Sequence, residues 1–195
     1  MKTTQKIGIL VLREFPGNED QAFLTIASNQ EFLAQVNVNW LNTDPPRKPT
    51  PFYAAKHTWL RPQNYKPTLY SIPQSVKRDF NLSDLEFPAP MVGAVLIVNL
   101  HAGYSMKTFA QTWDASIPFE DMLKSPRTGG IAWLRLQNLP FVLAVTQPKN
   151  PAIPLDDIRH LLALEPDRAV ICCAYEFDRE YIDKVLSALV KLVEG

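Results

Sequence analysis

Four runs of almost unbroken apolar residues constrain the fold of this chain more than any other feature. They are KIGILVL (6–12), MVGAVLIVNL (91–100), PFVLAVTQ (140–147) and AVICCAY (169–175). Runs of this length and composition are typical of strands buried on both faces, as in parallel sheets. The first run is too short for a signal peptide and is followed by no small-residue cleavage site. We therefore interpret all four runs as strands.

Predicted helices alternate with these strands from residue 91 onward. Apolar residues recur at helical spacing in 105–125, which Pro118 interrupts, in 155–164, and most clearly in 178–195. In the last segment Asp178 lies at the start, Lys191 lies near the end, and the apolar stripe consists of Ile182, Val185, Leu186, Leu189, Val190 and Val193. This order predicts right-handed βαβ units on a mostly parallel sheet flanked by helices, which is an α/β fold.

The N-terminal half is less regular. Residues 20–35 have helical spacing, with Asp20 as the expected N-cap. Residues 36–68 are rich in proline and aromatic side chains, and we predict only short strands there, near 54–60 and 68–72. No internal repeat or linker divides the 195 residues, so we expect a single domain spanning 1–195.

Composition excludes several classes of function. The formal net charge of +0 argues against a nucleic-acid binder that relies on bulk positive charge. No apolar run reaches the roughly 18 residues that a transmembrane helix needs, so we expect no membrane span. Cys172 and Cys173 are adjacent in a predicted strand and point to opposite faces, so we interpret them as small buried residues. Unpaired cysteines are consistent with a reducing cytoplasm.

Residues 140–195 resemble the C-terminal third of small Ras-like GTPases and are most similar to the bacterial MglA-like branch. The shared order is a strand that ends at the base-reading NKxD position, a proline-containing loop, an acidic helix start, a strand ending near cysteine, and an acidic-basic turn into the last helix. Residues 69–80 occupy the place of the family's DxxG switch, and 91–100 the strand after it. The resemblance implies a Ras-like, P-loop NTPase-type fold with three layers over nearly the whole chain.

At the phosphate loop the family has GxxxxGK followed by Ser or Thr, whose N–H groups, lysine and hydroxyl bind phosphates and magnesium. This sequence has one glycine there, no lysine between Lys6 and Lys48, and three acids that would repel phosphates. The eight residues are Arg13, Glu14, Phe15, Pro16, Gly17, Asn18, Glu19 and Asp20. Arg13 is either a phosphate contact or a solvated loop arginine.

The other two nucleotide motifs also depart from the family. The switch reads Ser71-Ile72-Pro73-Gln74, without the magnesium-binding acid or the glycine, so Gln74 has no phosphate or metal around which to orient water. The base-reading turn reads Thr146-Gln147-Pro148-Lys149, and Lys149, in place of the acid, can only donate hydrogen bonds. Tyr175, near the last base-contacting turn, is a candidate to fill a base pocket.

We therefore predict a catalytically inactive small-GTPase-like protein, a pseudo-GTPase without a cofactor, catalytic residue or metal. The resemblance implies a regulatory or scaffolding role with a protein partner, such as a roadblock-type (dynein-light-chain-like) homodimer. The switch-like face would supply the contacts, although its aromatic residues could instead pack on the core; the candidates are Phe52, Tyr53, Trp59, Gln74 and Phe80. Two alternatives stay open: a GTP/GDP-binding protein that uses Arg13 and Tyr175, and an unrelated α/β enzyme with His101 at its site.

Overall fold

The computed structural model describes nine segments of the chain, and every structural statement below concerns those segments. They are residues 5–13, 18–28, 33–41, 43–56, 65–72, 81–100, 129–149, 152–161 and 170–195. The helix that the sequence predicts over 105–125 lies outside them.

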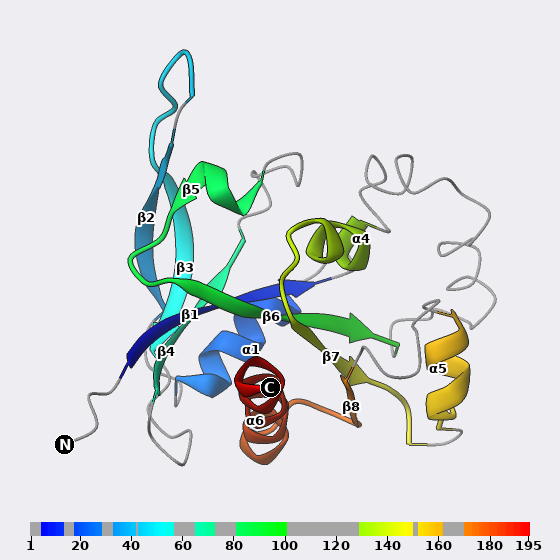
Figure 1. Ribbon diagram of the computed structural model, residues 1–195. Coiled ribbons are helices and arrows are strands. Elements are labelled where there is room, and N and C mark those ends of the chain that lie inside the picture. Colours follow the sequence, from blue (N-terminus) through cyan, green and yellow to red (C-terminus); the bar gives the residue numbers. More distant parts are fainter. Residues whose placement is uncertain are drawn as a thin grey trace.

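An eight-stranded sheet forms the centre of the molecule, with the strand order β5-β2-β3-β4-β1-β6-β7-β8 (Figure 1). Strands β4, β1, β6, β7 and β8 pair in parallel. Strands β5, β2 and β3 add antiparallel pairs on the β4 side. The strands are β1 (Gln5–Arg13), β2 (Ala34–Trp40), β3 (Thr50–Lys56), β4 (Tyr65–Ser71), β5 (Leu85–Glu86), β6 (Met91–Asn99), β7 (Phe141–Thr146) and β8 (Val170–Ala174).

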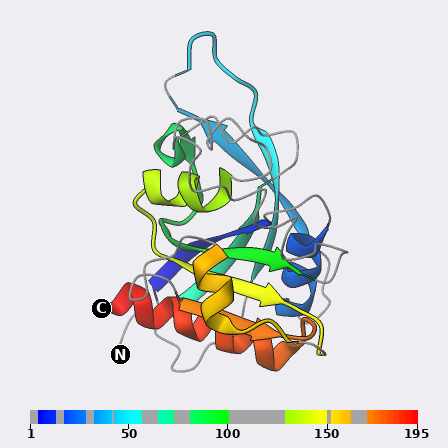
Figure 2. The same ribbon diagram turned by 90° about the vertical axis from the view of Figure 1, so that its right-hand side faces the viewer.

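Helices cover both faces of this sheet and give the expected three layers (Figures 1 and 2). The helix pair α1 (Glu19–Ala27) and α6 (Arg179–Glu194) packs on one face, in a core that includes Phe23 and Leu186. On the other face α4 (Gly129–Leu136) and α5 (Leu155–Leu161) contribute Trp133 and Ile158 to a second core. A 3-10 turn, η1 (Leu82–Asp84), precedes β5. The predicted mostly parallel α/β fold is therefore confirmed.

Helix α6 matches its sequence pattern closely. Asp178 is its N-cap, and its carboxylate accepts a hydrogen bond of 2.7 Å from the backbone N–H of Tyr181. Four of the six residues predicted for the apolar stripe are buried: Ile182, Val185, Leu186 and Leu189. Val190 is half-buried, but Val193 is exposed in the last turn, so the stripe ends one turn earlier than predicted.

Helix α1 is shorter than predicted. It ends at Ala27, where the Ser28 hydroxyl donates to the carbonyl oxygen of Thr25, 3.1 Å away. Serine competes in this way with the helical backbone and favours helix ends. Asn18, not Asp20, is the N-cap residue, and Asp20 lies in the first turn with a buried carboxylate.

The region that the sequence left irregular contains a hairpin. Strand β2 begins at Ala34, inside the segment predicted as helix, and β3 and β4 begin before the predicted short strands. The inward positions of β2 are Val36, Val38 and Trp40, which alternate with polar residues as in a strand exposed on one face. This alternation was the available signal, but the helical spacing just before it concealed where the strand begins.

Gly93 allows α6 to approach β6 closely. A Cβ atom at this position would lie 2.9 Å from Cδ1 of Leu189 and 3.1 Å from the carbonyl oxygen of Pro140. We expect Gly93→Ala to lower the free energy of unfolding by about 1–3 kcal/mol, as overpacked cores do. Urea denaturation measures this, with Gly8→Ala as control, because there the nearest atom is the flexible methyl group of Met91. Equal losses in the two variants would contradict this account.

Tyr181 ties α6 to the parallel strands. Its buried hydroxyl donates to the carbonyl oxygen of Cys172 at 2.7 Å and lies 3.1 Å from that of Val145. Burial, and to a smaller extent the thiols of Cys172 and Cys173, raise the pKa of Tyr181 well above its ordinary value.

The raised pKa of Tyr181 predicts a loss of stability at alkaline pH. Below about pH 10, the ordinary pKa of tyrosine, the contribution of Tyr181 to the free energy of unfolding is complete. Above this pH the Tyr181 hydroxyl ionises in the unfolded chain but stays neutral in the folded chain, so stability falls as pH rises. We expect Tyr181→Phe to lower stability by about 1 kcal/mol at neutral pH. Chemical denaturation from neutral to alkaline pH should show a shallower decline for the variant. Parallel pH profiles of the two proteins would refute this assignment.

Candidate functional site

Polar residues end four neighbouring strands of the sheet. Arg13 is the last residue of β1, Ser71 of β4, Asn99 of β6 and Thr146 of β7. Because these strands are parallel, their carboxyl ends meet at one edge, which we call the carboxyl edge, and α1 begins there at Glu19. Ligands of α/β proteins bind at such an edge, next to a helix N-terminus.

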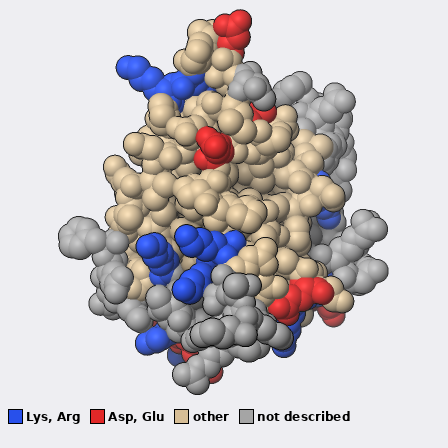
Figure 3. Space-filling model, turned by 60° about the vertical axis from the view of Figure 1, so that its left-hand side comes forward, with Lys and Arg blue, Asp and Glu red and all other residues tan. Residues whose placement is uncertain are grey.

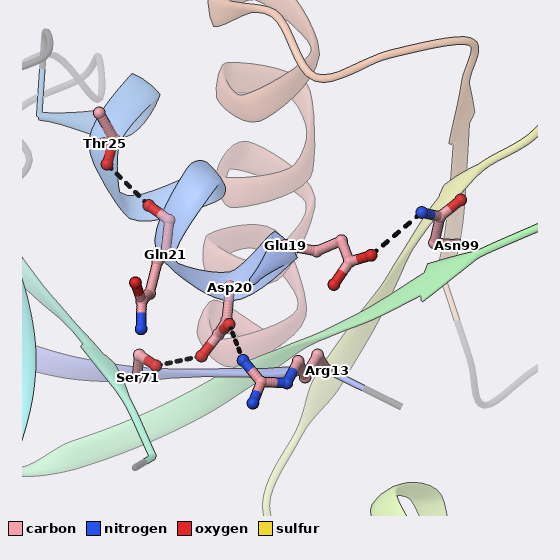
Figure 4. A network of polar contacts seen from close by, with 7 residues as sticks. All are labelled: Arg13, Glu19, Asp20, Gln21, Thr25, Ser71 and Asn99. Atoms are coloured by element: carbon pink, nitrogen blue, oxygen red, sulfur yellow. Dashed lines mark hydrogen bonds and ion pairs between the residues drawn. The ribbon is translucent and has the colours of Figure 1, made fainter. Parts of the chain in front are cut away.

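One carboxylate occupies the centre of the carboxyl edge. Asp20 is 2% exposed. Its Oδ1 lies 2.6 Å from Nη1 of Arg13, in an ion pair, and its Oδ2 accepts a hydrogen bond from the hydroxyl of Ser71 (Figure 4). Asp20 therefore links α1 to both β1 and β4, and both of its oxygens are engaged.

A second chain of polar contacts continues along the same edge. Oε1 of Glu19 accepts a hydrogen bond of 3.1 Å from the side-chain amide of Asn99 (Figure 4). The side-chain oxygen Oδ1 of Asn99 in turn accepts a hydrogen bond of 3.4 Å from the hydroxyl of Thr146. Glu19 and Asp20 thus place two carboxylates at the start of α1, where the helix dipole favours negative charge.

The resemblance to the GTPase motifs implies which family residues correspond to these positions. The motif's last two residues, lysine and a hydroxyl residue, open the helix after the phosphate loop, and here Glu19 and Asp20 open α1. Ser71 ends β4, where the family has the magnesium-binding acid. Under this resemblance the acid and the hydroxyl would have exchanged positions, and the Glu19 carboxylate would stand where the family has its lysine. A phosphate at this edge would meet negative charge where the motif supplies positive charge.

Three of the predicted base-reading residues already have partners in the fold: Gln147, Lys149 and Tyr175. Oε1 of Gln147 accepts a hydrogen bond of 2.8 Å from the backbone N–H of Ile153, which shapes the turn after β7. The ammonium group of Lys149 lies 4.7 Å from the ring centroid of Tyr175, in a cation–π contact. Both of these side chains are exposed, so the contact lies at the surface. Lys149 therefore covers the ring that was the candidate for a base pocket.

Two expectations about single residues need correction. Arg13 is not a solvated loop arginine, because its side chain is 13% exposed and paired with Asp20. Phe52 was a candidate partner contact, but it is fully buried and its ring packs edge-on against Phe87, with centroids 5.4 Å apart. The alternation of β3 turns Phe52 into the core, while Tyr53 remains half-buried on the opposite face.

The remaining candidates have no described contacts at the site. Asn18 is exposed, and its side chain makes no capping hydrogen bond. The following candidates lie outside the described residues: Glu14, Phe15, Pro16, Gly17, Trp59, Gln74, Phe80 and His101.

Comparison with known proteins supports the fold. No family model matches the sequence, and no curated protein matches it significantly. Solved structures do match, among them one described as nucleolar GTP-binding protein 1 from Plasmodium falciparum, with a TM-score of 0.50 and 10% identity over 98% of this chain and 88% of that one. The fold of this chain is therefore similar to that of this GTP-binding protein.

A second match, translation elongation factor SelB from Methanococcus maripaludis in its apo form, has a TM-score of 0.51 and 11% identity over 99% of this chain. The alignment covers 36% of the SelB chain, so this protein corresponds to about a third of that factor. At these identities the likeness concerns the fold alone. The expected three-layer fold, a mostly parallel sheet between helices, is thereby confirmed.

Two further properties concern only the part of the chain that the structure describes. Within it, no group of three or more His, Cys, Asp or Glu side chains is arranged to hold a metal ion. No helix in the same segments is both long and apolar enough to cross a membrane.

Proposed function

We propose that this protein is a pseudo-GTPase: a GTPase-type fold that does not hydrolyse GTP and acts through contacts with another protein. The observation that carries the proposal is the Asp20 carboxylate, held by Arg13 and Ser71 at the edge where a GTPase binds phosphate. Phosphoryl transfer depends on positive charge, from lysine, arginine and magnesium, to stabilise its transition state. Here Arg13, the cation that ends β1 at the carboxyl edge, is already paired with Asp20.

A nucleotide phosphate could enter this edge only at high cost. It would either displace Asp20 from Arg13, leaving a buried carboxylate without its ion pair, or lie beside Glu19 and Asp20. An uncompensated buried charge destabilises a protein by about 3–5 kcal/mol. The geometry therefore favours the arrangement in which Asp20 pairs with Arg13 over one in which a phosphate binds at this edge.

The alternative functions have weaker support. A nucleotide-binding protein that uses Arg13 and Tyr175 would require both side chains to leave their present contacts, with Asp20 and Lys149. An unrelated α/β enzyme centred on His101 has no supporting observation, because that residue lies outside the described segments.

The proposed partner follows from the family resemblance. An MglA-like protein in a bacterial cytoplasm would signal by binding a roadblock-type homodimer through its switch-like face. We retain Tyr53, Trp59, Gln74 and Phe80 as proposed contacts and omit Phe52, which is buried. The two free cysteines, Cys172 and Cys173, are in keeping with a reducing compartment.

The enzymatic part of the proposal is tested by single-turnover hydrolysis of radiolabelled GTP with magnesium. We expect phosphate release no faster than in buffer, because the described part of the edge supplies two carboxylates where the reaction needs cations. An active GTPase of similar fold provides the positive control. Magnesium-dependent release that saturates with GTP, and that Arg13→Ala abolishes, would overturn the proposal in favour of altered nucleotide chemistry.

A further inference from the structure

Three lysines lie on one face of the sheet, away from the carboxyl edge. Lys6 of β1 and Lys66 of β4 are paired directly in the parallel register. Lys56, the last residue of β3, is opposite Thr68, which is two residues from Lys66 on the same strand. Paired residues on neighbouring strands, and residues two apart on one strand, point to the same face. All three lysines therefore project from the face that also carries Tyr70. We call them the lysine patch.

The lysine patch is accessible, and no described acid forms a salt bridge with it. All three side chains are exposed. In Figure 3 a group of Lys and Arg side chains lies on one part of the surface, with acidic side chains above and below it. Among the described residues no salt bridge joins any of the three lysines to a carboxylate. Like charges on adjacent strands destabilise a sheet, so this arrangement has a cost that an external anion would remove.

We propose that the lysine patch is a docking site for an acidic segment of a partner protein. Three ammonium groups on three adjacent strands form a short row across the sheet, which fits carboxylates spaced along an extended peptide. The patch lies at the amino ends of β1 and β4, the opposite end of these strands from Arg13 and Ser71. The proposal therefore holds whether or not the carboxyl edge binds nucleotide.

The size and surroundings of the patch favour a peptide over other polyanions. Adsorption to anionic lipids typically uses clusters of about 4–8 basic residues, and the described residues contribute three to the patch. Binding to single-stranded nucleic acid typically adds aromatic side chains on which bases stack. Tyr70, the described aromatic residue nearest in register on this face, is buried. The formal net charge of +0 also gives nucleic acid little long-range attraction.

The test measures binding of a fluorescent peptide of alternating glutamate and serine by anisotropy, at low and at moderate salt. The patch variant is K6E/K56E/K66E. The matched control, K48E/K184E/K191E, makes the same change in net charge at exposed lysines elsewhere. Phosphatidylserine vesicles and an oligouridine serve as competing probes. Circular dichroism and thermal melting establish that both variants fold. A second patch variant, K6Q/K56Q/K66Q, only removes the repulsion between the lysines. Its melting temperature is expected at or above that of the wild type.

We expect the wild-type protein to bind the peptide, the patch variants to bind it at least about tenfold more weakly, and the control to retain binding. Binding should weaken with salt, because the charges are exposed. Equal losses in the patch and control variants, or no binding by the wild type, would overturn the proposal. Binding of the vesicles or the oligouridine through the patch, without binding of the peptide, would equally overturn it.

Discussion

Asp20→Ala is expected to lower the free energy of unfolding by about 3 kcal/mol, because it leaves the largely buried guanidinium of Arg13 without its ion-pair partner. It also removes the acceptor for the hydroxyl of Ser71. Urea denaturation at neutral pH measures the loss. Ser71→Ala removes one hydrogen bond from the same carboxylate and should cost about 1 kcal/mol.

Asp157→Ala is the matched control for Asp20→Ala, since Asp157 lies in the first turn of α5 but is exposed. Its effect should stay within about 0.5 kcal/mol, as for most surface positions. In a double-mutant cycle Asp20→Ala and Ser71→Ala should not be additive, because they remove the same interaction. If Asp20→Ala lowers the free energy of unfolding no more than Asp157→Ala does, the Asp20 carboxylate does not stabilise the carboxyl edge.

GTP, GDP and ATP are each expected to give no binding heat when titrated into the nucleotide-stripped protein, with or without magnesium. Any dissociation constant should be weaker than about 1 mM, which corresponds to less than about 4 kcal/mol of binding free energy. The physical reason is that Asp20 already satisfies Arg13, and Glu19 adds a second negative charge at the start of α1. Calorimetry, with thermal shift at millimolar nucleotide as a second readout, measures this.

Micromolar, magnesium-dependent binding of GTP would contradict the proposal. Arg13→Ala would then show how the nucleotide binds. If affinity falls sharply, Arg13 leaves Asp20 and contacts a phosphate; if affinity is unchanged, the contacts come from elsewhere in the chain. A roadblock-type partner that binds the protein equally well with and without nucleotide would support the proposed role independently.

The fold could be predicted best where one periodicity dominates a long segment. The buried runs of β6 and β7 and the stripe of α6 each bury a continuous set of side chains, so local pattern and tertiary structure agree. The boundary between α1 and β2 was missed, because helical spacing before Ala27 runs directly into the period-two pattern of Val36, Val38 and Trp40. In short segments of mixed polarity, tertiary packing decides between helix and strand.

The site could be predicted only in part. The sequence shows that the phosphate loop lacks lysine and that the switch lacks its acid, since both are properties of residue type. It could not show that Asp20 and Ser71, 51 residues apart, complete one hydrogen bond. Their pairing depends on β4 lying beside β1 in the sheet. Asp20 also carried a misleading local signal, since an aspartate before a helical pattern usually acts as an N-cap.

The internal carboxylate at the carboxyl edge has a consequence for regulation. A protein that holds its edge together with a bound nucleotide gains stability by mass action, in proportion to the logarithm of the ligand concentration. Asp20 is part of the chain, so its concentration at Arg13 and Ser71 never changes. Under the proposed function, the concentrations of GTP and GDP in the cell do not change the stability of this edge. Control over such a protein would then come from how much of it is made and which partner is present.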